Sequence, residues 1–178
     1  MQATVVSSWN DFDPLKHAIV GRADFTCIPP SELATEAKIP DDSDMRGMWG
    51  PRPLRTIEQA NQQLDQLVGI LEGRGIRVDR PEPIQWNQAA ITPDFTTGSM
   101  FGCMPPRDVL LTVGKEILSA PMSFRCRYWE YLAYHSLMQR YFDEDPGFRW
   151  EQAPRPRLTD DAYQAGYFDE ITIEERLD

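Results

Sequence analysis

Apolar residues recur with two different spacings in the first half of the chain. Short apolar runs at 16–21 and 75–80 are bounded by glycine or proline, and they predict buried strands. Between them, apolar residues recur every three or four positions. This predicts a helix that starts at a capping box of Thr56 and Gln59 and ends at Gly73. The apolar face of that helix comprises Ile57, Ala60, Leu64, Leu67, Val68 and Leu71.

The second half of the chain repeats this alternation of strands and helices. Apolar runs at 109–113 and 116–120 flank a glycine-lysine pair and predict a hairpin with a tight turn. An aromatic-rich segment at 123–141 predicts a helix, and residues 148–153 predict a further strand. Residues 108–153 are therefore expected to fold as strand, strand, helix, strand, and the whole chain to have an α/β fold.

Two segments lack such periodicity. Residues 22–55, rich in proline and acids, predict a long loop, which is uncommon in a compact domain unless it is functional or mobile. Residues 160–178 carry −6 of the net charge of −10, a composition typical of a solvated face or tail. Thr172 and Glu175 have capping-box spacing, but no stop signal follows them. We therefore expect 1–178 to be part of one domain, with a truncation point at the acidic segment.

Composition and charge narrow the function classes. The 178 residues are 41% hydrophobic and 26% charged, which is typical of a folded globular protein. The negative net charge argues against electrostatic binding to nucleic-acid phosphates. No apolar run approaches the roughly 20 residues that are needed to cross a bilayer. The first residues have no secretory signal pattern, and the three cysteines form neither a disulfide framework nor a CxxC metal site. We expect a cytoplasmic protein with no nucleic-acid or membrane partner.

The two histidines offer no recognisable catalytic site. His17 lies in a predicted strand and His135 on the predicted aromatic helix, where a histidine with satisfied hydrogen bonds is the common finding. Cys126 lies nine residues before His135, on the opposite face of a continuous helix, so the two are not expected to form a dyad. The motifs of zinc proteases, serine hydrolases and nucleotide-binding folds do not occur, so no metal or cofactor is expected.

The loop at 91–108 contains the densest group of candidate residues. Asp94 and Asp108 flank a stretch rich in proline and glycine, where a carboxylate can accept paired hydrogen bonds from a planar guanidinium. The alternative is that Asp108 caps a turn, or pairs with Arg107 or another arginine. Cys103 has no histidine near it in sequence, which favours a small buried thiol over a nucleophile.

A series of segments, in order over nearly the whole chain, resembles one known family. They are Trp9–Ala23, Arg80–Ile84, Thr92–Phe95, Met104–Asp108, Glu116–Met122 and Arg125–Tyr131. These segments resemble the arginine:glycine amidinotransferases. The stretch Lys38–Gly47 is most similar to the cyanobacterial branch of that family, which makes guanidino toxins such as cylindrospermopsin and saxitoxin.

The resemblance implies a fold and a reaction. The fold would be a pentein, a five-bladed ring of ββαβ modules, of which this chain would form an incomplete part. A cysteine would attack the guanidinium carbon of L-arginine and release ornithine, a histidine would shuttle protons, and the amidino group would pass to an acceptor amine such as glycine. By resemblance Asp108 would bind the substrate guanidinium, with Asp94, Arg107 and Met104 in supporting places, and the protein would form a homodimer.

The chain departs from the family in its catalytic elements. Relatives carry a Phe-Asp-Ala-Ala-Asp run, a His-Ile-Asp motif and a nucleophilic cysteine further along, and none of these occurs in the sequence. We therefore expect the N-terminal part of an amidinotransferase, with no catalytic residue and no turnover by itself, and with apolar surface left uncovered. The alternatives are a non-catalytic pseudoenzyme, a half-protein that needs a complementary chain, or a guanidine-modifying pentein hydrolase.

Overall fold

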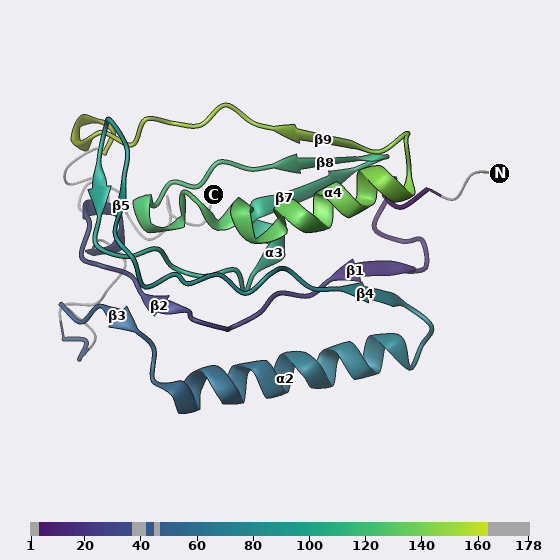
Figure 1. Cartoon of the computed structure of the whole chain (residues 1–178), viewed down its shortest axis with the longest axis horizontal. Coiled ribbons are helices and arrows are strands. Elements are labelled where there is room, and N and C mark those ends of the chain that lie inside the picture. The colour runs from purple at the N-terminus through teal and green to yellow at the C-terminus, as the bar shows by residue number, and fades with distance from the viewer. Residues whose placement is uncertain (1–3, 37–41, 45–46, 164–178) are drawn as a thin grey trace, which may run out of the picture.

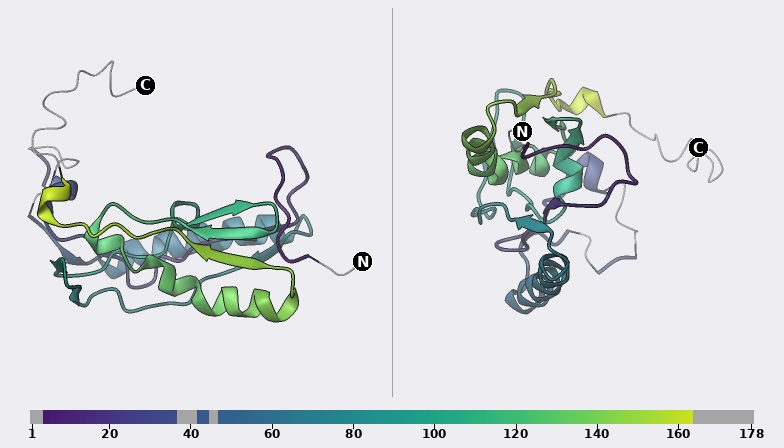
Figure 2. Two further views of the ribbon diagram at one scale, coloured as in Figure 1. Left: turned by 90° about the horizontal axis from the view of Figure 1, so that it is seen from above. Right: turned by 90° about the vertical axis from the view of Figure 1, so that its right-hand side faces the viewer.

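The protein is a layered, elongated assembly of short strands and two longer helices. The computed structural model describes residues 4–36, 42–44 and 47–163. In Figure 1 the long helix α2 (Leu54–Glu72) lies along one side, and the parallel strands β1 (His17–Ile19) and β4 (Arg77–Asp79) lie above it. The helix α4 (His135–Glu144) and a three-stranded sheet follow on the other side of these strands, as the end-on view in Figure 2 also shows. No helix among the described residues is long and apolar enough to span a bilayer.

The predicted strand, helix and strand of the first half are confirmed. β1 and β4 pair in parallel, with Ala18 opposite Val78, and α2 connects them. The apolar face of α2 turns toward the strands, but none of its residues is fully buried, and Leu67 and Ile70 stay 44% and 56% exposed. The helix therefore covers the strands on one side and leaves part of its own apolar surface open.

The predicted start of α2 is wrong by two residues. Pro53 precedes the first helical residue, and no side chain caps the helix. The amides of Thr56 and Ile57 already donate to the carbonyl oxygen of Pro53, at 2.9 and 3.2 Å. Proline is well suited to this place, because its fixed φ fits the approach to a helix and it carries no amide hydrogen that would need a partner. The spacing of Thr56 and Gln59 thus matched a capping box that does not form.

The hairpin and the third strand of the second half are confirmed. β7 (Leu110–Val113) and β8 (Glu116–Ser119) pair antiparallel around Gly114, whose φ of +57° suits glycine in a tight turn. β9 (Arg149–Gln152) then pairs parallel to β8, which completes a sheet in the order β7-β8-β9. A single helical turn, α3 (Pro106–Val109), precedes β7, so Asp108 lies on this turn at the entry to the strand.

The aromatic segment at 123–141 is not the continuous helix that its composition predicted. It forms two 3-10 turns, Arg125–Arg127 and Glu130–Tyr134, and the α-helix α4 begins only at His135. The ring of Phe95 contacts both Tyr128 and Trp129, at centroid distances of 5.5 and 5.8 Å. Tyr128 and Trp129 lie at the junction of the two 3-10 turns, as the residue that ends the first and the residue that precedes the second.

The remaining elements are short. Residues 22–55, predicted as a long loop, contain β2 (Cys27–Ile28), α1 (Leu33–Glu36) and β3 (Gly50–Pro51), and β2 pairs antiparallel with β3. A four-residue loop joins β5 (Ala90–Ile91) to its antiparallel partner β6 (Thr96–Thr97), and a 3-10 turn lies at Asp160–Ala162. The rest of the predicted acidic segment, 164–178, lies outside the described residues.

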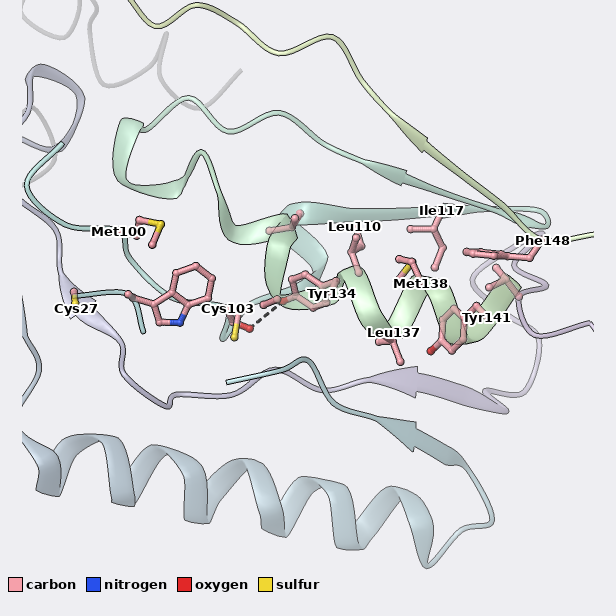
Figure 3. Packing of buried hydrophobic residues seen from close by; sticks show 14 residues of the cluster. Cys27, Met100, Cys103, Leu110, Ile117, Tyr134, Leu137, Met138, Tyr141 and Phe148 are labelled. Carbon is pink, nitrogen blue, oxygen red and sulfur yellow. Dashed lines mark hydrogen bonds between the residues drawn. The ribbon is translucent and has the colours of Figure 1, made fainter. Parts of the chain in front are cut away.

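The hydrophobic core runs along α4 and the sheet beside it. Figure 3 shows Met138 of α4 beside Leu110 and Ile117 of the hairpin, while Leu137 and Tyr141 lie on the side of the helix toward β1. The core continues past Tyr134 to a second group, of which Figure 3 labels Cys27, Met100 and Cys103 and which also includes Trp86. Outside the core, large apolar side chains are exposed, as expected: Phe12 is 94% exposed, and Leu111 and Val113 of β7 are more than half exposed.

Candidate functional site

A close backbone contact at the end of β1 positions the loop that leads to Asp108. Gly21 lies so near the loop that a Cβ atom built on it would meet the carbonyl oxygen of Met104 at 2.0 Å. Arg22 and Cys103 form an antiparallel bridge beside this contact. Only glycine allows two backbones to approach so closely. The sequence near residue 21 therefore determines where α3 and its aspartate lie.

Asp108 forms an ion pair with an arginine, which was one of the alternatives that the sequence allowed. Its Oδ2 atom accepts a hydrogen bond from Nη1 of Arg127 at 3.0 Å, and its Oδ1 atom lies 3.6 Å from Nε of Arg107. The Arg107 side chain is 92% exposed, whereas that of Arg127 is only 15% exposed. The other alternative was that Asp108 caps a turn; Asp108 lies in the first turn of α3, whose start has no side-chain cap hydrogen bond. Arg127 is thus the largely buried partner of Asp108, and Oδ1 has only the longer contact with the exposed Arg107 among the described residues.

Arg127 is itself held by a buried carboxylate. Its Nε and Nη2 atoms donate to the two oxygens of Glu130 at 2.8 and 2.7 Å, and its guanidinium lies 5.5 Å from the ring centre of Phe101. The Glu130 side chain has no exposed surface. Burial raises the pKa of Glu130 to about 7, although the hydrogen bonds and charge of Arg127 act in the opposite direction.

The sequence analysis placed neither Arg127 nor Glu130 in the site. The available signal was their i, i+3 spacing, which brings opposite charges together on a helical turn. This signal was weak, because such spacing usually produces a solvated surface pair rather than a buried one.

A small hollow of about 10 Å³ lies beside Arg127, which is one of its lining residues. Arg155 also lines it and stacks on Tyr131, with its guanidinium carbon 3.7 Å from the ring centre. The same arginine donates to the carbonyl oxygen of Tyr128 at 2.7 Å. This volume is about that needed by one water molecule, far below the roughly 300 Å³ of the smallest usual ligand pockets. Within the described residues, the hollow is an incomplete part of a pocket at most.

The other predicted site residues do not form one group with Asp108. Asp94 accepts hydrogen bonds from both Nε, at 2.8 Å, and Nη2 of Arg157, and these bonds hold the pKa of Asp94 below its usual range. Met104 is 43% exposed on the loop before α3. Of the supporting residues, Arg107 is in contact with Asp108, while Asp94 belongs to a separate ion pair.

The three cysteines are buried thiols, as expected for Cys103. Burial raises the pKa of Cys103 to about 12 and raises the pKa values of Cys27 and Cys126 as well. A nucleophilic cysteine needs the opposite shift, because the thiolate is the reactive form. His135 is exposed on α4 with its ring against Trp150, so the rejected dyad with Cys126 is not formed.

His17 has satisfied hydrogen bonds, as predicted. Its Nε2 atom lies 2.6 Å from Oδ2 of Asp79, and its Nδ1 atom lies 3.1 Å from the carbonyl oxygen of Val5. Tyr141 donates to the same Asp79 oxygen at 2.8 Å, and Arg140 donates to the other oxygen at 2.6 Å. This network joins β1, β4 and α4, so its role is structural. Across the part of the chain that the structure describes, no three His, Cys, Asp or Glu side chains are grouped to hold a metal ion.

Comparison with known proteins identifies relatives of one kind. No family model matches the chain. Among curated proteins, the mitochondrial glycine amidinotransferase of Gallus gallus is 36% identical over 170 residues, which are 91% of this chain and 38% of that protein. The L-arginine:L-lysine amidinotransferase of Pseudomonas savastanoi pv. phaseolicola is 36% identical over 173 residues, which are 96% of this chain and 47% of that protein.

Solved structures agree. SxtG, an amidinotransferase from Microseira wollei in the saxitoxin biosynthetic pathway, superposes with a TM-score of 0.80 at 34% identity, over 91% of this chain and 45% of that one. The inosamine-phosphate amidinotransferase StrB1 from Streptomyces griseus superposes with the same TM-score at 37% identity, over 90% of this chain and 46% of that one. The chain thus spans less than half the length of each of these relatives. Over that span, the chain is a homologue of the amidinotransferases.

Proposed function

We propose that the protein to which this chain belongs transfers an amidino group from L-arginine to an acceptor amine. A cysteine thiolate forms a bond to the guanidinium carbon, the bond from that carbon to the ornithine nitrogen breaks, and a general acid gives that nitrogen the proton with which ornithine leaves. The acceptor nitrogen then takes the amidino group, loses a proton to a general base and restores the thiolate. The named activities of four relatives support the proposal, since each is an amidinotransferase.

The single observation that carries the proposal to this chain is the state of Asp108. One of its oxygens accepts a hydrogen bond from Arg127, and within the described parts of the chain the other has its charged contact with the exposed Arg107, at 3.6 Å. A free carboxylate oxygen on a fixed carboxyl group can accept a hydrogen bond from an incoming guanidinium. We therefore assign Asp108 the role of binding the guanidinium of L-arginine, with Arg107 and Met104 at the edge of the site.

The finer architecture is part of the same proposal. The strand, strand, helix, strand order of 108–153 supports a ββαβ module of a pentein ring. The buried thiols and the satisfied His17 support the view that this chain supplies no nucleophile or proton shuttle, and so does not turn over by itself. A cytoplasmic location and a homodimer stay predictions, which cell fractionation and sedimentation would test.

The test is a titration of the 178-residue chain with L-arginine, followed by amide NMR shifts. We expect saturable shifts around α3 that are lost in Asp108→Asn and retained in the matched control Asp94→Asn. L-citrulline, which has a neutral ureido group in place of the guanidinium, should produce no shifts. Absence of any arginine-dependent shift in the unsubstituted chain would overturn the role of Asp108.

The reaction class is tested on products. Arginine labelled in its amidino group is incubated with the chain and glycine, and ornithine and the labelled products are measured. We expect no ornithine from the 178 residues alone, so measured turnover would contradict the assignment of catalysis to residues that this chain lacks. In any preparation that is active, label in citrulline or urea would favour the hydrolase alternative over transfer.

A further inference from the structure

We propose that Arg127, fixed by Glu130, is a positioning residue that holds the Asp108 carboxylate in its ligand-binding rotamer. This inference rests on the proposed function, because it concerns the residue assigned there to bind the guanidinium. The comparisons name no residue roles, and the contact network alone points to this pair.

The contacts of Arg127 and Asp108 show which of the two side chains holds the other in place. Arg127 has three anchors besides Asp108: the two oxygens of Glu130 and the ring of Phe101. Asp108 has one short side-chain contact, the 3.0 Å bond from Arg127, and its side chain is 32% exposed. The arginine would keep its place without the aspartate, whereas the aspartate would be free to rotate without the arginine.

The charges of the three groups explain why a buried glutamate is needed. An Arg127–Asp108 pair alone would be neutral and would offer little attraction to a cation. Glu130 adds a second negative charge at the Nε and Nη2 atoms of Arg127, so the three side chains together carry one net negative charge once Glu130 is ionised, above about pH 7. That charge is what a positively charged guanidinium would meet.

The size of the expected effect follows from rotamer statistics. A carboxylate held in one χ1 rotamer that becomes free to use three would spend about one third of its time in the binding geometry. The apparent dissociation constant scales with the inverse of that fraction, so loss of positioning should weaken L-arginine binding about threefold. Loss of the carboxylate charge in Asp108→Asn should weaken binding more, by roughly tenfold or greater.

The chain offers a matched control in a second network of the same composition. Arg77 makes a two-pronged contact with Glu144, at 2.6 and 3.0 Å, and also contacts a second carboxylate, that of Asp79, at 3.0 Å. Arg77→Lys removes the same fork geometry as Arg127→Lys while leaving the Asp108 side chain untouched. Any general effect of losing a forked arginine should therefore appear in both variants.

The experiment measures the Asp108 χ1 angle from three-bond couplings and the L-arginine dissociation constant in the same samples. In Arg127→Lys we expect averaged Asp108 couplings, unchanged backbone shifts outside the site and about threefold weaker binding, with none of these changes in Arg77→Lys. Because a lysine beside buried Glu130 could prevent folding, Glu130→Gln is measured in parallel. It keeps the size of the side chain and should weaken binding at pH 8 by roughly threefold or more through the lost charge.

Three outcomes would be decisive. A single Asp108 rotamer and unchanged arginine affinity in Arg127→Lys would overturn the proposal, as would equal losses in Arg77→Lys. If the unsubstituted chain does not bind L-arginine, the proposed function of Asp108 fails, while the χ1 couplings still decide whether Arg127 positions it. If Arg127→Lys does not fold, unchanged affinity in Glu130→Gln would overturn the role of the buried carboxylate.

Discussion

Replacing Tyr141 by phenylalanine tests the network that joins β1, β4 and α4. The change removes one hydroxyl group and keeps the ring, which packs edge-on against His17 and Phe148 at centroid distances of 5.4 and 5.6 Å. The hydroxyl donates to Oδ2 of Asp79 at 2.8 Å and is completely enclosed. The same hydroxyl also lies 3.1 Å from Nε2 of His17, so the substitution removes one buried hydrogen bond to a carboxylate together with this second contact.

The magnitude can be worked out from the partners that remain. A hydrogen bond to a charged group contributes about 1.5–3 kcal/mol. Asp79 keeps contacts from His17, Arg140 and Arg77 at 2.6, 2.6 and 3.0 Å, so the lower part of that range applies. We expect a loss of about 1.5–2 kcal/mol in the free energy of unfolding, which is a fall of about 3–8 °C in the melting temperature of a chain of this size.

The loss should depend on pH in one direction. Burial favours the neutral form of Asp79, but hydrogen bonds from Tyr141 and His17 and the charges of Arg77 and Arg140 outweigh it and hold the pKa of Asp79 below its usual range. Stabilisation from a lowered carboxyl pKa is present above the unfolded value of about 3.9 and is lost as the pH falls through the folded value. The difference in the free energy of unfolding between the unsubstituted chain and the Tyr141→Phe variant should be constant above about pH 5 and should become smaller below about pH 4.

The assay is urea denaturation followed by tryptophan fluorescence, from pH 3 to pH 8. Tyr131→Phe is the matched control, because within the described residues its hydroxyl makes no recorded hydrogen bond. A Tyr141→Phe variant that unfolds within 0.5 kcal/mol of the unsubstituted chain at pH 7, or a difference that persists unchanged at pH 3, would refute the reasoning.

Three further predictions concern burial and backbone contact. The pKa of the Glu130 carboxyl is about 7 in the folded chain, so as the pH rises the unfolded chain loses the carboxyl proton first. The free energy of unfolding should therefore fall by up to about 3 kcal/mol between about pH 4.5 and 7. The Glu130→Gln variant should lack this decline in urea titrations. If the free energy of unfolding of the variant falls with pH as much as that of the unsubstituted chain, the prediction is contradicted. Cys27, Cys103 and Cys126 should not react with a thiol reagent at pH 8 until denaturant is added, and rapid reaction of the native chain would disprove their burial. Gly21→Ala should cost about 1–3 kcal/mol or more in the same titrations, since its Cβ would lie 2.0 Å from a carbonyl oxygen, and Gly69→Ala, in open space on α2, is the control.

Much of the element order was predictable from hydrophobic periodicity. The strands at 17–19 and 77–79, the helix between them and the hairpin at 110–119 appeared where the pattern placed them, because burial of one face dictates that pattern. Two predictions of element boundaries were wrong. The helix α2 begins directly after Pro53, ahead of the expected Thr56 cap. The aromatic segment before His135 forms 3-10 turns, and two adjacent rings of that segment contact Phe95.

The candidate site, too, was predictable from the sequence only in part. From the sequence, Asp108 was predicted at the entry to a strand, in a motif similar to one of the amidinotransferases, and no cysteine or histidine of the chain was expected to be catalytic. The packed fold was needed to show that the partner of Asp108 is Arg127, nineteen residues away, and that His17 pairs with Asp79, sixty-two residues away. The physical reason is that periodicity records which side of an element is buried, whereas a charge pair depends on the distance between two elements after they have packed.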